Sequence, residues 1–480
     1  MRKWIPLAAI CLGAFMLLVD VSIVNVALPK MSADLNSSFT SLQWVVDIYA
    51  LTLAALLMVC GSFGDRLGHR RLYLCGLVLF AAASLVCALA PDAATLITAR
   101  AAQGVGGATM MTSTTALIAG AYQGRDRGAA FGVWGAVNGA AAAIGPVLGG
   151  LLTDQFGWRS IFLVNLPIAA VALAMTLGKG LRLPRPHAVE GRVDAAGALA
   201  FTVFAAALTY GLIESGSHGW GSTVVQVPLS GAAAALIVFA VVELRVRRPL
   251  LDLSLLRNRS FTGLLVGGLL MNAAAFAELT YTSLWLQQAL GLSPLDAGLA
   301  VSPMAATAFV VALGTGRSLH RFPPQLPIGV GLLFIGTGTL LLTAVSATSG
   351  WSALLPGMLV TGVGVGLSTP TLMATALGSV APQRAGMASG ALNTSRQLGY
   401  ALGIAVLGTI FQQHAHGHSA RAAFAAGLHP VFLTAGVTGL VAGVLVLTAV
   451  RRPHTTALAH PVATSSAAGA PAGQADNIAR

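Results

Sequence analysis

The segment Gly61-Ser-Phe-Gly-Asp65-Arg66-Leu-Gly-His-Arg70-Arg71 is the most polar stretch in the first 90 residues, and it separates two long apolar runs. Each run can cross a lipid bilayer, so we expect two neighbouring antiparallel helices that are joined at a membrane face. Three small residues in the segment allow close backbone approach: Gly61, Gly64 and Gly68. We expect Asp65 to form local ion pairs with the neighbouring arginines. The alternative, a solvated basic loop, explains the arginines but not the spacing of the glycines and the aspartate.

The composition of the chain indicates that it is surrounded by lipid rather than by water. Of 480 residues, 56% are hydrophobic and 9% are charged, whereas soluble domains carry about 25% charged residues. A chain of this composition is expected to be an integral membrane protein. Its abundant Ala and Gly, and the presence of only three lysines among 27 basic residues, indicate a bacterial genome of high GC content.

The basic residues are distributed unevenly over the expected loops. Most of the 27 fall on one side of the membrane, as the positive-inside rule requires of the cytoplasmic side. The five exceptions are Lys30, Arg159 and Arg421, expected outside, and Arg100 and Arg396, expected within helices. Both termini are therefore predicted to be cytoplasmic, and no basic patch remains that would need a nucleic acid.

Spans of about 20 apolar residues predict an all-α polytopic membrane protein. Fourteen spans are expected, near 7–28, 43–63, 72–90, 95–119, 129–152, 160–178, 195–214, 226–244, 260–283, 295–315, 327–346, 352–375, 388–411 and 430–450. The first run lacks a good cleavage site and contains Asp20, so we expect a retained helix rather than a signal peptide.

Polar stretches after the sixth and eighth spans divide the chain into four parts. We expect a six-helix bundle over residues 1–178, cytoplasmic linker segments with two extra transmembrane helices over 179–259, and a second six-helix bundle over 260–450. The tail, 451–480, is too poor in bulky apolar residues to fold, and it is predicted to be disordered in the cytoplasm.

The opening segment resembles the loop between helices two and three of the major facilitator superfamily, G-x-x-x-D-R-x-G-R-[RK]. The matching residues are Gly61, Asp65, Arg66, Gly68 and Arg70 or Arg71, with His69 where the family usually has arginine. The resemblance implies two six-helix bundles and a gating role for this loop. The corresponding loop of the second half, Gly316–Pro323, has His320 in place of the acidic residue, so the role is assigned to the first half only.

The first expected helix resembles the D-x-x-I-V-N-x-A-L-P signature of the fourteen-helix drug:proton antiporter branch of this superfamily, at Asp20, Asn25 and Pro29. Ionisable groups in a bilayer are costly and are functional candidates by default. We therefore expect Asp20 to carry the coupling proton. The alternative is a carboxylate that a neighbouring helix merely satisfies.

The fourth expected helix matches the superfamily element R-x-x-Q-G-x-G-x-A at Arg100 and Gln103. An arginine stays charged, so it does not carry the proton, but it favours the ionised form of a nearby carboxyl group. Asp20 is the expected partner of Arg100. A purely structural arginine that bonds to backbone carbonyls is the alternative.

The fifth expected helix resembles the antiporter element G-x-x-x-G-P-x-x-G-G, with Ala141 in place of its first glycine. The matching residues are Gly145, Pro146, Gly149 and Gly150. The resemblance favours efflux over uptake, and the proline permits a kink near the outer end. General packing of small residues explains the glycines nearly as well.

Two further acids lie in apolar spans. Asp47 is expected within two turns of the outer surface, either as a cation contact or as an interfacial residue beside Trp44. Glu278, with Asn272 a turn and a half away, is either a second proton or cation site or an outer-end residue that reaches water. Asp47, Asn25, Gln103 and Asn272 form the expected substrate pathway.

Two polar segments of the second half carry weaker signals. Arg396 falls within the first turns of the expected helix 388–411, from where it can extend to the cytoplasmic surface. His414-Ala-His416-Gly-His418 has no Cys or Asp beside it, so no metal site is predicted. The sequence has no Walker loop, zinc helix or nucleophile elbow, which predicts neither ATP as a direct energy source nor an enzyme.

These residues together predict a proton-coupled secondary exporter of amphipathic drugs or antibiotics that works by alternating access, in the bacterial cytoplasmic membrane. It is expected to act as a monomer in the lipid bilayer, with protons as coupling ion, no other cofactor, and cations among its substrates. A narrow exporter of one metabolite or self-made antibiotic is the first alternative, and a non-transporting membrane protein on the same scaffold is the second.

Overall fold

The computed structural model describes residues 2–37, 39–178, 194–246, 249–315, 321–415 and 419–450, and these residues are helical apart from short connections. Eleven of the described helices are long and apolar enough to cross a membrane, against fourteen expected spans. Three further long helices, introduced below as α4, α5 and α15, carry polar residues and glycines that lower their hydropathy. The second-half loop at 316–320, His416, His418 and the tail lie outside the described residues.

The first bundle consists of the helices that precede the linker. After the short turn η1 (Arg2–Trp4), these are α1 (Ile5–Asp34), α2 (Phe39–Leu67), α3 (His69–Leu89), α4 (Ala93–Ala121), α5 (Gly124–Phe156), α6 (Ser160–Leu163) and α7 (Asn165–Leu177). Helices α6 and α7 follow one another and make one apolar span. Helix α5 continues through position 146, so the expected kink does not interrupt it.

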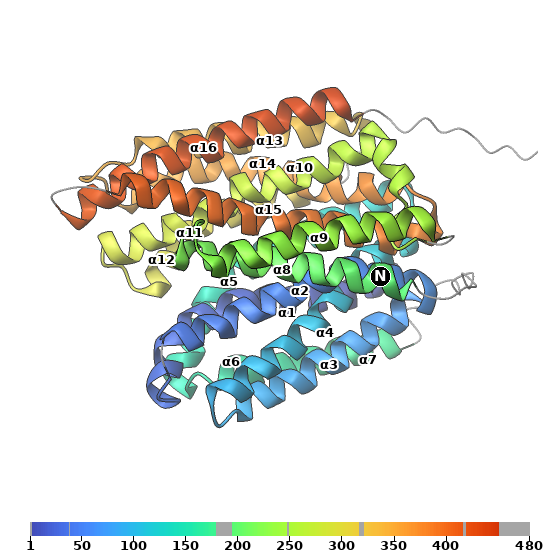
Figure 1. Ribbon diagram of the computed structural model, residues 1–480, viewed down its shortest axis with the longest axis horizontal. Helices are drawn as coiled ribbons and strands as arrows, with labels where there is room; N and C mark the ends of the chain where they lie inside the picture. Colours follow the sequence, from blue (N-terminus) through green and yellow to red (C-terminus); the bar gives the residue numbers. More distant parts are fainter. Residues whose placement is uncertain are drawn as a thin grey trace, which may run out of the picture.

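The second bundle lies above the first in Figure 1. Its long helices are α10 (Arg259–Ala275), α11 (Ala277–Leu284), α12 (Pro294–Thr315), α13 (Gln325–Leu341), α14 (Leu355–Gly378), α15 (Ala385–His414) and α16 (Ala420–Ala449). The shorter segments are η2 (Leu253–Arg257), η3 (Trp285–Ala289), η5 (Leu342–Ala344), η6 (Trp351–Leu354) and η7 (Pro382–Arg384). Helices α10 and α11 are separated at Phe276, two residues before Glu278.

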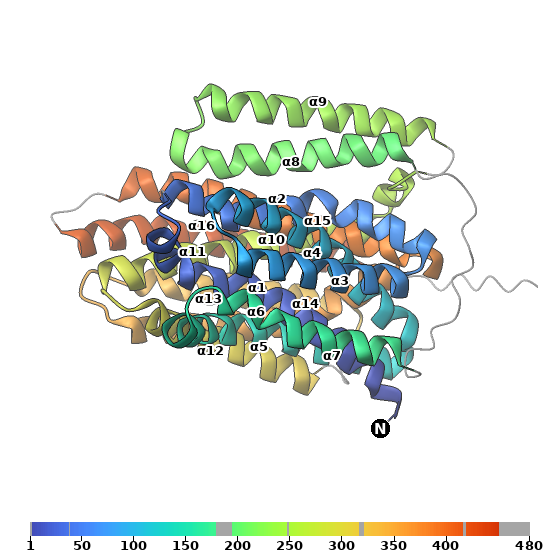
Figure 2. The ribbon, with the colours of Figure 1, turned by 90° about the horizontal axis from the view of Figure 1, so that it is seen from below.

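The linking helices α8 (Ala195–His218) and α9 (Thr223–Arg245) pack against each other and form a separate layer in Figure 2. Helix α8 contacts both α2 of the first bundle and α15 of the second. After α9, Asp252 pairs with Arg384 just before α15, at 2.5 Å. Hydrogen bonds from Ser254 and Arg384 hold the pKa of Asp252 below its usual value. The linker is therefore attached to the start of α15.

Small residues bring α2 and α15 into backbone contact where the bundles meet. A Cβ atom added at Gly61 would overlap the carbonyl oxygen of Gly386, and one added at Gly390 would lie 2.8 Å from the Cα of Met58. Helix α5 uses its own glycines in a similar way, since Gly145 faces Ser22 of α1. The glycine patterns therefore mark close helix crossings, as their spacing predicted.

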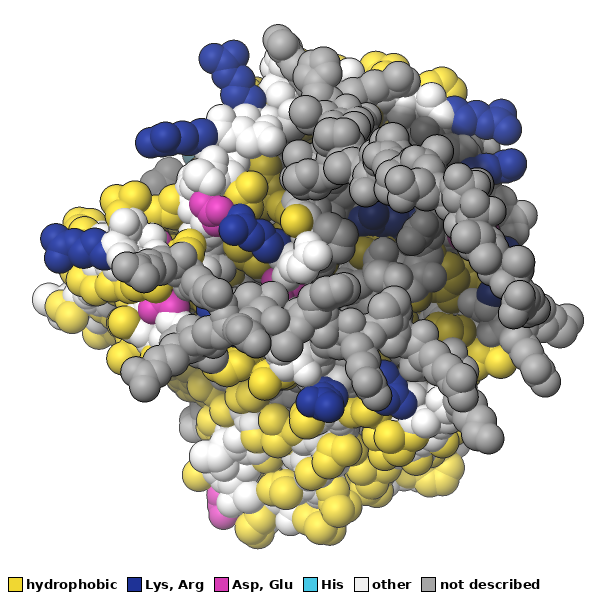
Figure 3. Space-filling view, turned by 90° about the vertical axis from the view of Figure 1, so that its right-hand side faces the viewer, with side chains coloured by type: hydrophobic (Ala, Val, Ile, Leu, Met, Phe, Trp, Pro, Cys, Tyr) yellow, Lys and Arg dark blue, Asp and Glu magenta, His cyan; other side chains and the backbone are white. Residues whose placement is uncertain are grey.

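The two ends of the bundle differ in charge. Figure 3 shows Lys and Arg side chains gathered on the end that contains the α2–α3 loop and the N-terminus, which we call the basic end. It carries Arg66, Arg70 and Arg71 of that loop. The opposite end, where α1 finishes at Asp34, is the far end.

Candidate functional site

Asp20 lies in the middle of α1, 15 residues after Ile5 and 14 before Asp34. These spacings place it about 21–23 Å from either end of the helix, at 1.5 Å per residue. Its side chain is completely buried, and Arg100 Nη1 donates a hydrogen bond to its Oδ2 at 2.5 Å. The structure thus brings together the two buried charges that the sequence paired.

Three further side chains complete the Asp20 cluster. Asn165, at the start of α7, donates to Asp20 Oδ1 at 2.9 Å. Gln103 Nε2 lies 3.4 Å from the same oxygen and donates to Ser84 Oγ at 2.7 Å. Arg100 also donates to Gln103 Oε1 at 2.9 Å. The cluster therefore joins α1, α3, α4 and α7, and its buried charges are paired and hydrogen-bonded, as a low-dielectric environment requires.

The guanidinium of Arg100 has a second set of contacts with α2. Its Nε donates to the carbonyl oxygen of Val45 at 2.9 Å, and its Cζ lies 4.3 Å from the ring centroid of Tyr49. Arg100 therefore makes both of the predicted interactions: it pairs with Asp20, and it also bonds to a backbone carbonyl group. Because Arg100 contacts both Asp20 and α2, a change of charge at Asp20 would alter the contacts between α1, α2 and α4.

Asp47 lies on a different side of α2 from this cluster. Val45 and Tyr49 contact Arg100, and a helix turns about 100° per residue, so the position midway between them points away. Asp47 is half-buried and interacts electrostatically with Glu214 of α8 and Tyr400 of α15. It therefore lies where the linking helices meet both bundles, and the structure does not bring it to Asp20.

Glu278 lies in the second bundle, in the first turn of α11. Its side chain is 1% exposed, so it does not reach water, and Oε2 accepts a hydrogen bond from Thr282 Oγ1 at 2.7 Å. Asn272 donates to the carbonyl oxygen of Gly268 within its own helix, at 3.2 Å, so these two predicted residues are not brought together. Asn25 lies on α1, where only its backbone is described.

The carboxylate of Asp65 crosses from the first bundle to the second at the basic end. Its Oδ1 accepts the backbone N–H of Gly386 at 2.7 Å, and its Oδ2 accepts that of Met387 at 2.8 Å. The ring of His69, which replaces the family's usual arginine, lies 3.0 Å from Oδ1. The described partners of Asp65 are therefore His69 and the start of α15, whereas the expectation named the neighbouring arginines. A helix N-terminus offers free N–H groups and a partial positive charge, which favour a carboxylate.

Other contacts close the same end. Ser389 of α15 is hydrogen-bonded to Thr115 Oγ1 of α4 and donates to the carbonyl oxygen of Thr112 at 3.2 Å. Arg70 donates to the carbonyl oxygen of Thr176, at 2.9 Å, and so fixes its loop to α7. The basic end is thus held together by polar contacts between α2, α4 and α15, next to buried apolar residues of α2 and α15.

A comparison with protein families identifies the scaffold on which these contacts lie. The model of the Major Facilitator Superfamily matches residues 10–404. The chain belongs to this superfamily. It is accordingly a multi-pass membrane transporter and not an enzyme.

Similar curated proteins of the superfamily include three named for resistance. The chain is 37% identical to multidrug resistance protein Stp of Mycobacterium tuberculosis, over 85% of this chain and 75% of that protein. It is 34% identical to the methylenomycin A resistance protein of Streptomyces coelicolor, over 85% of both chains. It is 37% identical to the puromycin resistance protein pur8 of Streptomyces alboniger, over 85% of this chain and 82% of that one.

The fold itself is similar to that of a solved transporter. The crystal structure of the human organic anion transporter MFSD10 superposes with a TM-score of 0.64 at 17% identity, covering 92% of this chain and 99% of that chain. At this identity the similarity concerns the fold only.

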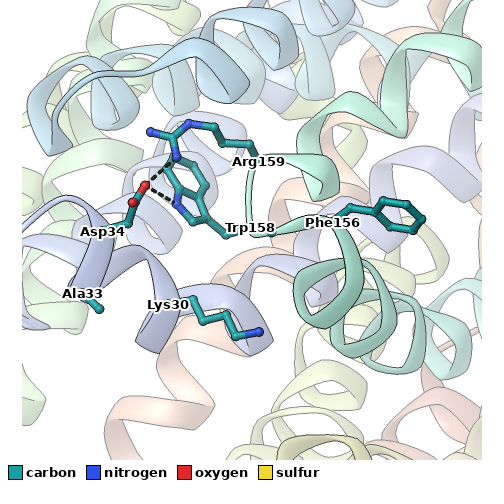
Figure 4. A pocket seen from close by; sticks show the side chains of 7 residues that line it. Lys30, Ala33, Asp34, Phe156, Trp158 and Arg159 are labelled. Carbon is teal, nitrogen blue, oxygen red and sulfur yellow. Dashed lines mark hydrogen bonds and ion pairs between the residues drawn. The ribbon is translucent and has the colours of Figure 1, made fainter.

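The far end of this superfamily member contains a surface hollow of about 500 Å³, shown in Figure 4. Asp34 accepts hydrogen bonds there from Trp158 Nε1 at 2.9 Å and from Arg159. Lys30 reaches Asp154 at 2.7 Å. The side chains of Lys30, Asp34 and Arg159 are about half exposed. Asp34 is 14 residues after Asp20 in α1, so the hollow lies between α1 and the α5–α6 connection and does not reach the buried cluster.

Two residues of the buried cluster were missed in the sequence, Ser84 and Asn165. Both are isolated polar residues in apolar spans, which was the available signal. Nothing local distinguishes them from the many Ser and Thr residues whose hydroxyl groups bond to their own helix, as Thr176 does to Ala172.

The Asp65 contacts predict the behaviour of a gate variant of this transporter. Asp65→Asn should slow turnover while leaving substrate binding nearly intact, because the variant loses the charge that holds the start of α15 at the closed basic end. A hydrogen bond to a charged group contributes about 1.5–3 kcal/mol, so we expect a decrease of about tenfold or more in transport rate. Equilibrium binding and initial transport rates would be measured on the same purified protein, with the exposed Asp154→Asn as control. Lost binding with normal turnover would contradict the gate role.

Proposed function

We propose that this transporter is a proton-coupled exporter of amphipathic drugs or antibiotics that works by alternating access. The observation that carries the proposal is the fully buried pair of Asp20, in the middle of α1, and Arg100, in the second turn of α4. Buried charge in a membrane segment is costly and is retained where it works, for example in a proton relay. The resistance proteins among its relatives, Stp included, support export as the direction.

We further propose fourteen crossings with both termini in the cytoplasm of a bacterial cell. Eleven described helices qualify by hydropathy, and α4, α5 and α15 have 29, 33 and 30 residues. A crossing needs about 20 residues, so these three are long enough, and packing between other helices shields their polar residues. The basic end faces the cytoplasm under the positive-inside rule, which supports an outward-facing state closed at the cytoplasm by Asp65 and Ser389.

Proton coupling predicts that export stops when a protonophore collapses the gradient while ATP is held constant. A proton moving across about 150 mV releases about 3.5 kcal/mol, which sustains a substrate gradient of a few hundredfold at one proton per substrate. Export of a fluorescent drug from loaded cells would be followed before and after protonophore addition. A non-hydrolysable nucleotide analogue in inside-out vesicles provides the ATP control. Undiminished export without a gradient would overturn the antiporter proposal.

A narrow exporter of one metabolite or antibiotic is the second candidate, and a specific observation favours it. Some relatives carry a multidrug name, whereas others are named for a single compound, methylenomycin A or puromycin. A resistance panel in a host that lacks its own pumps separates the two. Protection against several unrelated compounds supports a multidrug pump, and protection against one compound class supports the narrow exporter.

A further inference from the structure

Arg396 lies deep in α15, contrary to its expected place near the cytoplasmic surface. The helix begins at Ala385 rather than at 388, so Arg396 follows its start by 11 residues and precedes its end by 18. At 1.5 Å per residue this is about 16 Å from the basic end. The stem of Arg396 packs against α10, since a Cβ atom on Gly268 would lie 3.2 Å from its Cγ. The stem of the side chain is therefore packed between α15 and α10, about three turns from the start of α15.

The face of α15 that carries Arg396 points into the space between the two bundles. Ser389, Asn393 and Tyr400 share this face, at helical spacings of three and four residues. On the basic side of Arg396, Ser389 contacts Thr112 and Thr115 of α4, which closes the interface. On the far side, Tyr400 is 37% exposed and interacts with Thr280 of α11 and Asp47 of α2. Arg396 thus lies between a closed gate and an accessible region that both bundles line.

The guanidinium of Arg396 has no partner among the described residues. Its Nε is buried without a hydrogen bond, and no described carboxylate lies within ion-pair distance. By contrast, the completely buried Arg100 uses both Nε and Nη1 on Val45, Gln103 and Asp20. An unpaired cation at membrane depth is costly, and the planar guanidinium fork matches a carboxylate in a bidentate manner. Arg396 therefore offers a vacant position for an anion.

We propose that Arg396 binds the carboxylate of an acidic amphipathic substrate at the interface of the two bundles. The inference rests on the proposed function, because it names a substrate class for the exporter. It assigns recognition of the anionic group to the second bundle, away from the Asp20–Arg100 pair of the first. Asp47 and Glu278 are the protein carboxylates that could reach Arg396 in another access state, and the experiment below includes that case.

The test compares two probes that differ in charge and by one methyl group, 11-(dansylamino)undecanoic acid and its methyl ester. Binding to the purified full-length protein is followed by dansyl fluorescence, without any gradient. Arg396→Gln should weaken binding of the acid about tenfold to hundredfold, the loss of one charge-assisted pair, while the ester binds as it does to the unaltered protein. Arg396→Lys should restore part of the loss. Arg245→Gln, at the exposed end of α9, is the matched control and should change neither probe.

Three results would overturn the assignment. Failure of the acid to bind the unaltered protein, or equal loss of both probes in Arg396→Gln, means that Arg396 does not select an anion. Recovery of acid binding when Asp47→Asn or Glu278→Gln is added to Arg396→Gln means that Arg396 serves an internal ion pair. Transport of both probes in proteoliposomes is measured separately. Arg396-dependent binding without transport would sustain this inference and count against the export function instead.

Discussion

Replacing Asp20 with asparagine is expected to abolish proton-driven export of neutral and cationic substrates alike. Asparagine keeps the shape of the side chain, and it can still bond to Asn165, but it cannot bind and release a proton at the Arg100 contact. A carrier must be protonated in one access state and ionised in the other, because desolvation favours the neutral form and a nearby cation the charged form. Asp20 is the described acid that has both features.

The comparison is made in proteoliposomes with an imposed pH gradient and one substrate of each charge. Asp47→Asn and Glu278→Gln should mainly weaken transport of the cation, since neither acid contacts a buried basic group among the described residues. Asp20→Asn leaves Arg100 buried and unpaired, which costs about 3–5 kcal/mol and could unfold the protein. The double variant Asp20→Asn/Arg100→Gln removes both charges, and it should fold and bind substrate without gradient-driven transport.

The opposite pattern would move the proton carrier to the other bundle. If Asp20→Asn retains gradient-driven transport of the neutral substrate and Glu278→Gln loses it, then the buried acid of α11 carries the proton. Asp20 would in that case be only a structural residue, whose charge is satisfied by the hydrogen bonds of its cluster.

Gly61→Val should reduce turnover about tenfold to hundredfold without preventing folding of either bundle. The new side chain would overlap the carbonyl oxygen of Gly386 at the α2–α15 crossing, and overpacking of this kind costs about 1–3 kcal/mol. Because the crossing joins the two bundles, which separate in the proposed alternating-access cycle, the cost falls on the state closed at the basic end. The population of that state, and with it the transport cycle, should decrease by the corresponding factor.

The matched control for this variant is Gly120→Val. Gly120 lies in the last turn of α4 and is exposed, and a Cβ atom added there would have no neighbour within 4 Å. In a background whose four native cysteines are replaced by alanine, labelling of a cysteine introduced at Ser389 reports on opening of the basic end, and it should become faster in Gly61→Val only. Unchanged labelling and unchanged transport in Gly61→Val would show that the two backbones do not need to approach so closely during the cycle.

Several features of this transporter follow from sequence alone, because their physical causes are local. Hydropathy over about 20 residues predicts a membrane helix wherever it lies in the fold, and the uneven distribution of basic residues predicts the side on which loops lie. The pairing of Asp20 with Arg100 was predictable for a related reason. Few charges occur within the apolar spans, each needs an opposite charge, and so the number of possible partners is small.

Where several partners were chemically equivalent, only the tertiary structure decided among them. Asp65 lies among arginines, yet its carboxylate bonds to backbone N–H groups at the start of α15, 321 and 322 residues away. Every helix N-terminus offers such groups, and the sequence does not indicate which helix N-terminus packs against Asp65. The depth of Arg396 depended likewise on where α15 begins. The sequence determines which polar groups are costly to bury, because that cost depends on the chemical type of the side chain. The packing of distant helices determines which partners these groups bond to, because a hydrogen bond requires a specific distance and angle between two atoms.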